Sequence, residues 1–168
     1  MALTLVATAG GLTSNTYCTQ AEALTYHEAH LYASTWTGAT SANKDKALAM
    51  ATRLLDEQIN WYGWKSSNNQ ALAWPRIGIY DKEGVSLASN TIPTFLKNAT
   101  AELARLLIAS DRTVENEMKG FKSINIGKGA VHIIPDRYDR PGVIPPSVWA
   151  IIRPFGCVVT QSRSIVRV

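Results

Sequence analysis

The stretch ALAMATRLLDEQINWYGWKSSNNQALAWPR, residues 47–76, decides the fold of this 168-residue chain. In its first half, apolar residues recur every three or four positions, and charged residues occupy the other side. This spacing predicts an amphipathic helix whose apolar face packs in a core. The apolar face consists of Ala47, Leu48, Ala51, Leu54, Leu55 and Ile59, and the charged face of Lys46, Arg53, Asp56 and Glu57.

The second half of the stretch is rich in aromatic residues. Three of the five tryptophans, Trp61, Trp64 and Trp74, lie within fourteen positions. In one interpretation the rings pack over the end of the helix, because tryptophan buries a large apolar area. In the other, they form with Lys65 and Arg76 a stacking platform for single-stranded nucleic acid. We favour packing, since a binding groove usually carries more positive charge than two residues supply.

Length and composition are those of a folded, soluble protein. The 168 residues fit one domain with a substantial core, and 46% are hydrophobic and 18% charged. The net charge of +4 is unevenly distributed: residues 1–118 hold nine Lys and Arg against eleven Asp and Glu, whereas residues 119–168 hold eight against two. We expect the basic C-terminal third to meet an anionic partner, either nucleic acid or an acidic protein surface.

The cysteine positions predict a protein of a reducing compartment, and the apolar runs predict no membrane span. Cys18 and Cys157 lie far apart and outside any CxxC motif. We expect unpaired thiols in the cytosol, with a single long-range disulfide as the alternative. The apolar N-terminal run lacks the positive segment of a signal peptide. No run reaches the roughly eighteen apolar residues of a membrane span, so no membrane contact is expected.

Helices are predicted on both sides of the central one. Residues 19–22 have the form of a capping box and predict a helix over residues 20–33. A loop rich in Thr, Ser, Gly and Asn, residues 34–43, leads to the central helix, whose N-cap is Ser41 or Asn43.

The second half of the chain contains further elements. A proline at the expected first turn opens a helix over residues 93–110. Alternating apolar residues between glycines predict a hairpin within residues 121–134, and a short helix follows at residues 147–153. The expected fold class is mainly α: a small bundle of three to four helices with a short β-hairpin and extended N- and C-terminal arms.

We divide the chain into a helical-bundle domain, residues 1–112, and a basic β-hairpin with a C-terminal docking extension, residues 113–168. The helical spacing and the aromatic cluster together predict the bundle core. Its members are Leu48, Ala51, Leu54, Leu55, Ile59, Trp61, Trp64, Trp74, Phe95, Leu96, Ala99, Leu103 and Leu106.

No motif indicates catalysis. His27 and His30 are spaced i, i+3, whereas the HExxH zinc motif needs i, i+4, and no third ligand is signalled. Residues 125–129, NIGKG, lack the glycine spacing and the Ser or Thr of a phosphate loop. The sequence therefore predicts no enzyme, no cofactor and no metal. A metalloenzyme built on the histidine pair is the least favoured alternative.

Four blocks of the chain form a family pattern. They are SNTYCTQAEALTYHEAH (14–30), KDKALAMATRLLDEQ (44–58) and, as the most specific pair, QALAWPR (70–76) followed by IPTFLKNATAELARLL (92–107). Together they resemble the head-to-tail connector proteins of tailed bacteriophages, also called adaptor or head completion proteins. That family is often labelled DnaT-like single-stranded DNA-binding. The resemblance covers about residues 1–110, and PPSVWAIIRPF (145–155) is similar to the tails of such adaptors.

The resemblance implies a structural virion protein that forms a ring beneath the portal and surrounds the DNA channel. The implied partners are the portal protein, a tail or second connector (nozzle) protein, and eleven further copies of this chain. The implied location is the virion neck, after assembly in the host cytoplasm. For contacts with these partners or with packaged DNA we nominate the basic residues Lys119, Lys122, Lys128, Arg153, Arg163 and Arg167.

The alternative function is single-stranded DNA binding in phage replication. In that case Trp64 and Trp74 are stacking platforms and not core residues. Replacing either with alanine then weakens DNA binding, whereas it destabilises the fold if the residue belongs to the core.

Overall fold

A computed structural model describes residues 3–114, 121–127, 130–135 and 142–159. Within these ranges the fold is mainly α, as predicted. The helices are α1 (Gln20–Glu28), α2 (Ser34–Thr37), α3 (Ser41–Gln58), α4 (Thr94–Ala109) and α5 (Pro146–Ile152). The strands are β1 (Ile59–Trp61), β2 (Trp64–Lys65), β3 (Arg76–Ile77), β4 (Phe121–Gly127), β5 (Ala130–Pro135) and β6 (Gly156–Val158). Among these strands β1 pairs with β6, β2 with β3 and β4 with β5, all antiparallel.

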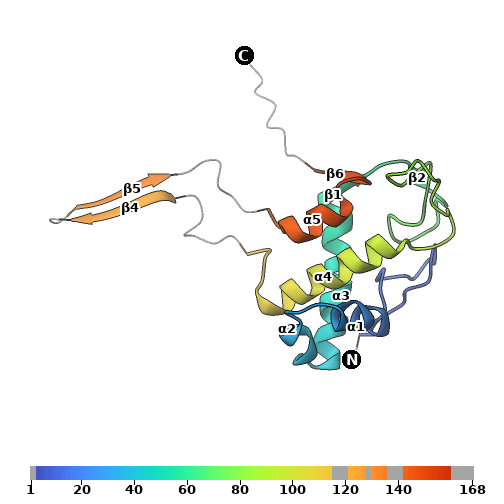
Figure 1. The fold of residues 1–168 in the computed structure, drawn as a ribbon, viewed down its shortest axis with the longest axis horizontal. Coiled ribbons are helices and arrows are strands. Elements are labelled where there is room, and N and C mark those ends of the chain that lie inside the picture. Colours follow the sequence, from blue (N-terminus) through green and yellow to red (C-terminus); the bar gives the residue numbers. More distant parts are fainter. Residues whose placement is uncertain (1–2, 115–120, 128–129, 136–141, 160–168) are drawn as a thin grey trace, which may run out of the picture.

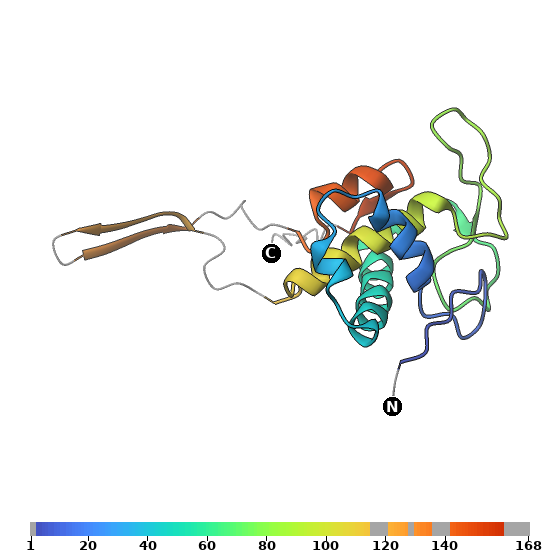
Figure 2. The ribbon, with the colours of Figure 1, turned by 60° about the horizontal axis from the view of Figure 1, so that its bottom comes forward.

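Helix α4 lies at the centre of the fold. It packs against α1, α2, α3 and α5, and in Figures 1 and 2 it crosses α3. Its buried residues include the polar Thr100 and Glu102 as well as a row of alanines and leucines. A helix that is buried on nearly all sides is surrounded by the core. The predicted central helix, α3, supplies one wall of that core.

Most of the predicted core residues are buried. They are Leu48, Ala51, Leu54, Leu55, Ile59, Trp61, Trp74, Leu96, Ala99 and Leu103. Phe95 and Leu106 are partly buried and pack against this core. Trp64 is a correction, because 74% of it is exposed. It lies in the two-residue strand β2, where the spacing rule that selected the helical residues does not apply.

The first helix is shorter than predicted. Its capping box forms as expected, but α1 ends at Glu28, and residues 34–37, which were predicted to be loop, form α2. The reason is the fully buried Trp36, whose ring lies 4.9 Å from the ring of His27 between centroids. Burial of this one large side chain fixes a short helical turn in an otherwise polar segment.

The N-cap of α3 is Thr40, one residue before Ser41 and three before Asn43, the two predicted candidates. Its hydroxyl accepts a hydrogen bond from the Asn43 N–H at 3.3 Å. Ser41 is already the first residue of the helix, and its hydroxyl accepts a hydrogen bond from Gln20 at 2.9 Å. Neither predicted candidate is the N-cap, and Ser41 was the nearer of the two.

The C-terminal part of the chain returns to the helical body. Val148, Ile152 and Phe155 are buried in the same core as α3 and α4, and the ring of Phe155 stacks on that of Phe95 at 3.8 Å. Strand β6 pairs with β1. Residues 143–158 therefore belong to the body, and the predicted extension beginning at residue 113 is corrected for this segment.

The predicted hairpin is present as β4 and β5. Its register places Ile124 opposite Ile133 and Ile126 opposite Val131. In Figures 1 and 2 the hairpin projects from the helical body.

Residues 3–7, predicted as part of an extended arm, form neither helix nor strand and are fastened to the loop before α1. The Asn15 side chain accepts a hydrogen bond from the Val6 N–H at 2.8 Å and donates one to the Thr4 carbonyl at 2.9 Å.

None of the helices in the described ranges is long and apolar enough to cross a membrane.

Candidate nucleic-acid interface

The aromatic cluster of residues 61–74 divides into a buried and an exposed part. Trp61 and Trp74 are 8% and 1% exposed, and their rings meet edge to face at 5.6 Å. Trp74 also meets Phe95 edge to face at 5.5 Å. The packing interpretation therefore holds for these two tryptophans. Trp64, by contrast, lies at the surface.

Exposed apolar side chains occur along β2, β3 and the residues next to them. Tyr62 is 51% exposed, Trp64 74%, Ile77 49% and Tyr80 59%, and the next residue of β2, Lys65, is also exposed. We call these five residues the Trp64 surface. In Figure 1 β2 lies at the end of the helical body opposite the β4–β5 hairpin. Exposed aromatic faces of this kind offer stacking contacts to unpaired bases.

The Trp64 ring lies against Gly78, the residue directly after β3. Trp64 pairs with Ile77 across the two strands, and the next residue, Gly78, has a positive φ of 76°. A Cβ atom at Gly78 would lie 3.2 Å from Cζ3 of Trp64. Because glycine has no Cβ, the ring can rest on the backbone there while most of it stays in solvent. The ring is thus supported on one side.

The guanidinium of Arg76 is engaged inside the protein. Nε donates to the Tyr62 carbonyl at 2.6 Å, and Nη2 donates to the carbonyls of Gly63 at 2.6 Å and Trp61 at 3.2 Å. Nη1 donates to the Ala73 carbonyl at 3.1 Å. The predicted role of Arg76 as a cation of the stacking platform is therefore corrected, since its donors already have main-chain partners.

Asp56 of helix α3 holds the aromatic segment, residues 61–76, through a further set of hydrogen bonds. The Tyr17 hydroxyl donates to Asp56 at 2.5 Å, and the other oxygen of Asp56 accepts from the Ala73 N–H at 2.9 Å. Burial raises the pKa of the Asp56 carboxyl and of the Tyr17 hydroxyl. Asp56 was expected on the charged face of the helix, and its partners come from segments that helical spacing does not reveal.

The positive charge at the Trp64 surface is modest. Lys65 and Lys82 are exposed, and the acidic residues Asp81 and Glu83 flank Lys82. One Asp81 oxygen accepts hydrogen bonds from the N–H groups of Glu83 and Val85, at 3.0 and 2.7 Å. Apolar contact therefore has to supply most of any affinity for a polyanion at this surface.

The basic residues nominated for partner contacts lie elsewhere. Arg153 is exposed at the C-terminal end of α5. Lys122 lies on β4, whose side chains are outside the described structure. Lys119, Lys128, Arg163 and Arg167 are outside the described residues, so their contacts remain predictions.

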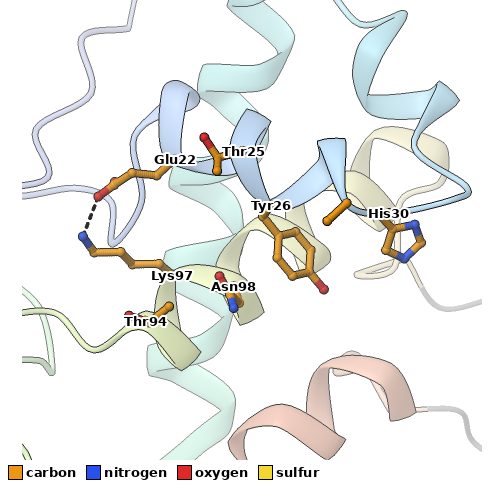
Figure 3. A pocket seen from close by; sticks show the side chains of 8 residues that line it. Glu22, Thr25, Tyr26, His30, Thr94, Lys97 and Asn98 are labelled. Atoms are coloured by element: carbon orange, nitrogen blue, oxygen red, sulfur yellow. Dashed lines mark hydrogen bonds and ion pairs between the residues drawn. The ribbon is translucent and has the colours of Figure 1, made fainter.

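A pocket of about 540 Å³ opens between α1 and α4, as Figure 3 shows. At one end Lys97 pairs with Glu22 at 2.5 Å. Partial burial alone would raise the pKa of Glu22, but the hydrogen bonds from Lys97 and Thr19 lower it. At the other end His30 lies 3.7 Å from Glu102, which Arg105 also binds at 2.6 Å.

The two histidines of the predicted pair have different surroundings. His27 is buried, and its Nε2 lies 3.1 Å from the Ala101 carbonyl. Burial lowers its pKa, which favours the neutral ring. Within the described part of the chain, no three His, Cys, Asp or Glu side chains gather in a way that would hold a metal ion.

Sequence reasoning named Trp64 and Lys65 but missed Tyr80 as an exposed aromatic residue and Gly78 as a support. A detectable signal was present: glycines at 63 and 78 flank the short strands. Glycines close to an aromatic residue indicate a tight approach of main chain and ring.

The comparisons with known proteins give one match. The model of a family described as "Putative DnaT-like ssDNA binding protein" matches residues 1–133. No curated protein and no solved structure matches the chain. The matched residues include the whole Trp64 surface.

Proposed function

The chain belongs to the family of DnaT-like ssDNA binding proteins, and from this premise we propose that it binds single-stranded DNA through the Trp64 surface. The observation that carries the proposal is the Trp64 ring, which is 74% exposed although it is held against Gly78. An aromatic ring fixed in solvent presents its face to a base without first being ordered.

Such a surface selects single strands over duplex. Bases in a duplex are stacked on one another, whereas those of a single strand can stack on aromatic side chains, whatever their identity. Trp64, Tyr62 and Tyr80 supply aromatic rings, and Lys65 supplies one charge for a neighbouring phosphate. Binding is therefore expected to tolerate many sequences and to depend only weakly on salt.

The test is titration of a labelled oligothymidylate followed by fluorescence anisotropy. Stacking on Trp64 contributes about 1–3 kcal/mol, so Trp64→Ala should weaken binding by about 5- to 150-fold. The control is Tyr32→Ala, an aromatic residue of similar exposure, 73%, in the turn between α1 and α2. Equal affinity of the wild type and Trp64→Ala would refute this site.

A second candidate function is the head-to-tail connector of a tailed phage. It is supported by the sequence blocks described above and by the β4–β5 hairpin. A two-stranded hairpin is only marginally stable by itself in water, so a partner that covers it is expected. Portal protein, a tail or nozzle protein, or neighbouring copies in a twelve-membered ring would provide that cover, with the virion neck as location.

Mass measurement separates the two functions. Light scattering would be recorded on the protein alone and after mixing with portal-bearing capsids, with single-stranded DNA titrated in parallel. Joining of the capsid vertex with weak DNA binding supports the connector. Tight single-strand binding without capsid association supports the first proposal and contradicts the second.

A further inference from the structure

We propose that the Trp64 surface binds mainly unpaired nucleobases, with only a minor contact to the phosphate backbone, and that Arg76 is its positioning residue. The inference rests on the proposed single-strand binding and adds to it the chemical class of the group bound. It also assigns to Arg76, which lies on β3 next to this surface, a role other than phosphate contact.

The donors of Arg76 are largely used. An arginine has five N–H groups, and four of them bind the carbonyls of Trp61, Tyr62, Gly63 and Ala73 at 2.6–3.2 Å. A phosphate that took these donors would leave four carbonyls without their partners. Losing these four hydrogen bonds costs more free energy than one phosphate contact in water contributes.

These hydrogen bonds fix the position of Trp64. They hold the chain on both sides of Gly63, which has a positive φ of 65° and approaches β3 closely. A Cβ at Gly63 would lie 2.2 Å from the Ile77 carbonyl oxygen. Trp64 follows directly, and its neighbour Lys65 pairs with Arg76 itself in the register of β2 and β3. Arg76 therefore sets where the Trp64 ring meets Gly78.

A lysine at position 76 cannot make these hydrogen bonds. The planar guanidinium reaches carbonyls on two segments at once, whereas an ammonium is a single point with three donors. Arg76→Lys therefore keeps the positive charge but loses most of the main-chain contacts. This variant separates positioning from charge, because a residue that acts on phosphates as a charge would be replaceable by lysine.

The cations that remain at the surface are few. Lys65 and Lys82 are exposed, with Asp81 and Glu83 beside Lys82. Each phosphate neutralised on a single strand changes log K by about −0.7 per unit of log salt. We therefore expect a slope close to that of one contact, and we expect the bases to supply the rest of the affinity.

The first experiment uses the wild-type full chain and two probes of equal length and charge, an oligothymidylate and an abasic oligomer. Loss of the bases should weaken binding by at least the factor seen for Trp64→Ala, about 5- to 150-fold. Equal affinity for the two probes would overturn the assignment to nucleobases. This test needs no variant to fold.

The second experiment compares Arg76→Lys, Trp64→Ala and the double variant with the oligothymidylate, at salt concentrations from about 50 to 200 mM. Arg76→Lys should weaken binding, and the double variant should bind no more weakly than Trp64→Ala, because the arginine acts through the ring. The salt slope should stay unchanged. The matched control is Arg53→Lys, at an exposed arginine paired with Glu57 on α3.

The outcomes distinguish this inference from the proposed function. Wild-type affinity of Arg76→Lys, or additive effects in the double variant, would overturn the positioning role while Trp64 binding stands. An unchanged affinity of Trp64→Ala would instead remove the site itself. Circular dichroism melting of each variant confirms that binding is measured on folded protein.

Discussion

In the helical body, Trp36 and Trp74 are 0% and 1% exposed, whereas at the Trp64 surface the indole ring is 74% exposed. The body holds its rings by burial among other apolar side chains. The Trp64 surface holds its ring by polar means: hydrogen bonds from Arg76 to main-chain carbonyls and a glycine on which the ring rests. An aromatic residue that has to stay available in solvent thus needs a main-chain framework in place of a core.

The largest expected effect is the loss of a buried tryptophan ring. Trp74→Ala removes a buried ring between Trp61 and Phe95 and should lower the free energy of unfolding by about 3–5 kcal/mol. Trp64→Ala should change it by no more than about 0.5 kcal/mol, as substitutions at exposed sites do. Denaturant titration measures both values. Equal destabilisation by the two variants would mean that the two tryptophans do not differ in role.

The next effect concerns the framework itself. Gly63→Ala introduces a Cβ 2.2 Å from the Ile77 carbonyl oxygen at a φ of 65°, so both clash and strain should destabilise the protein by about 2–4 kcal/mol. Gly84→Ala is the matched control. It has a φ of 82° and no atom within 4 Å of the added Cβ, so only the strain of about 1–2 kcal/mol applies. Similar losses in both variants would contradict the tight approach of the chain to β3.

The smallest effect lies at the ion pair of the α1–α4 pocket. Because the pKa of Glu22 is lowered in the folded protein, its contribution to stability is present above the ordinary pKa of 4.5. It is lost as pH falls through the lowered value. Lys97→Gln should reduce this acid-dependent loss by less than about 1 kcal/mol, since the pair is partly exposed.

Thermal melting between about pH 3 and pH 6 measures the acid-dependent loss, because that range spans the ordinary pKa of a glutamate. Arg53→Gln serves as the control at another ion pair, with Glu57 on α3. An acid-dependent loss that is equal in Lys97→Gln and the wild type would contradict this contribution of the Glu22–Lys97 pair.

The long helices were predictable because their signals are local. Apolar residues at helical spacing indicated α3 and α4, and the sequence of residues 19–22 indicated the start of α1. The β4–β5 hairpin followed from alternation between glycines. In each case the pattern lies within the element that it predicts.

The remaining features depend on residues that are far apart in the sequence. Strand β6 joins β1 across almost one hundred positions, and neither strand exceeds three residues. The division of the tryptophans into buried Trp61 and Trp74 and exposed Trp64 depends on irregular segments without a period. The partners of Arg76 are main-chain carbonyls, and those of Asp56 are the Tyr17 hydroxyl and the Ala73 N–H, which no local sequence pattern reveals.

The pairing of β1 with β6 determines which contacts can form while the chain is still being synthesised. A nascent chain that ends before α5 lacks the buried Val148, Ile152 and Phe155, and the Tyr62 N–H lacks the Phe155 carbonyl to which it donates at 2.9 Å. The helices made earlier can form while synthesis continues. The hydrogen bond from Tyr62 to Phe155 and the pairing of β1 with β6 can therefore form only after the last described strand has left the exit tunnel.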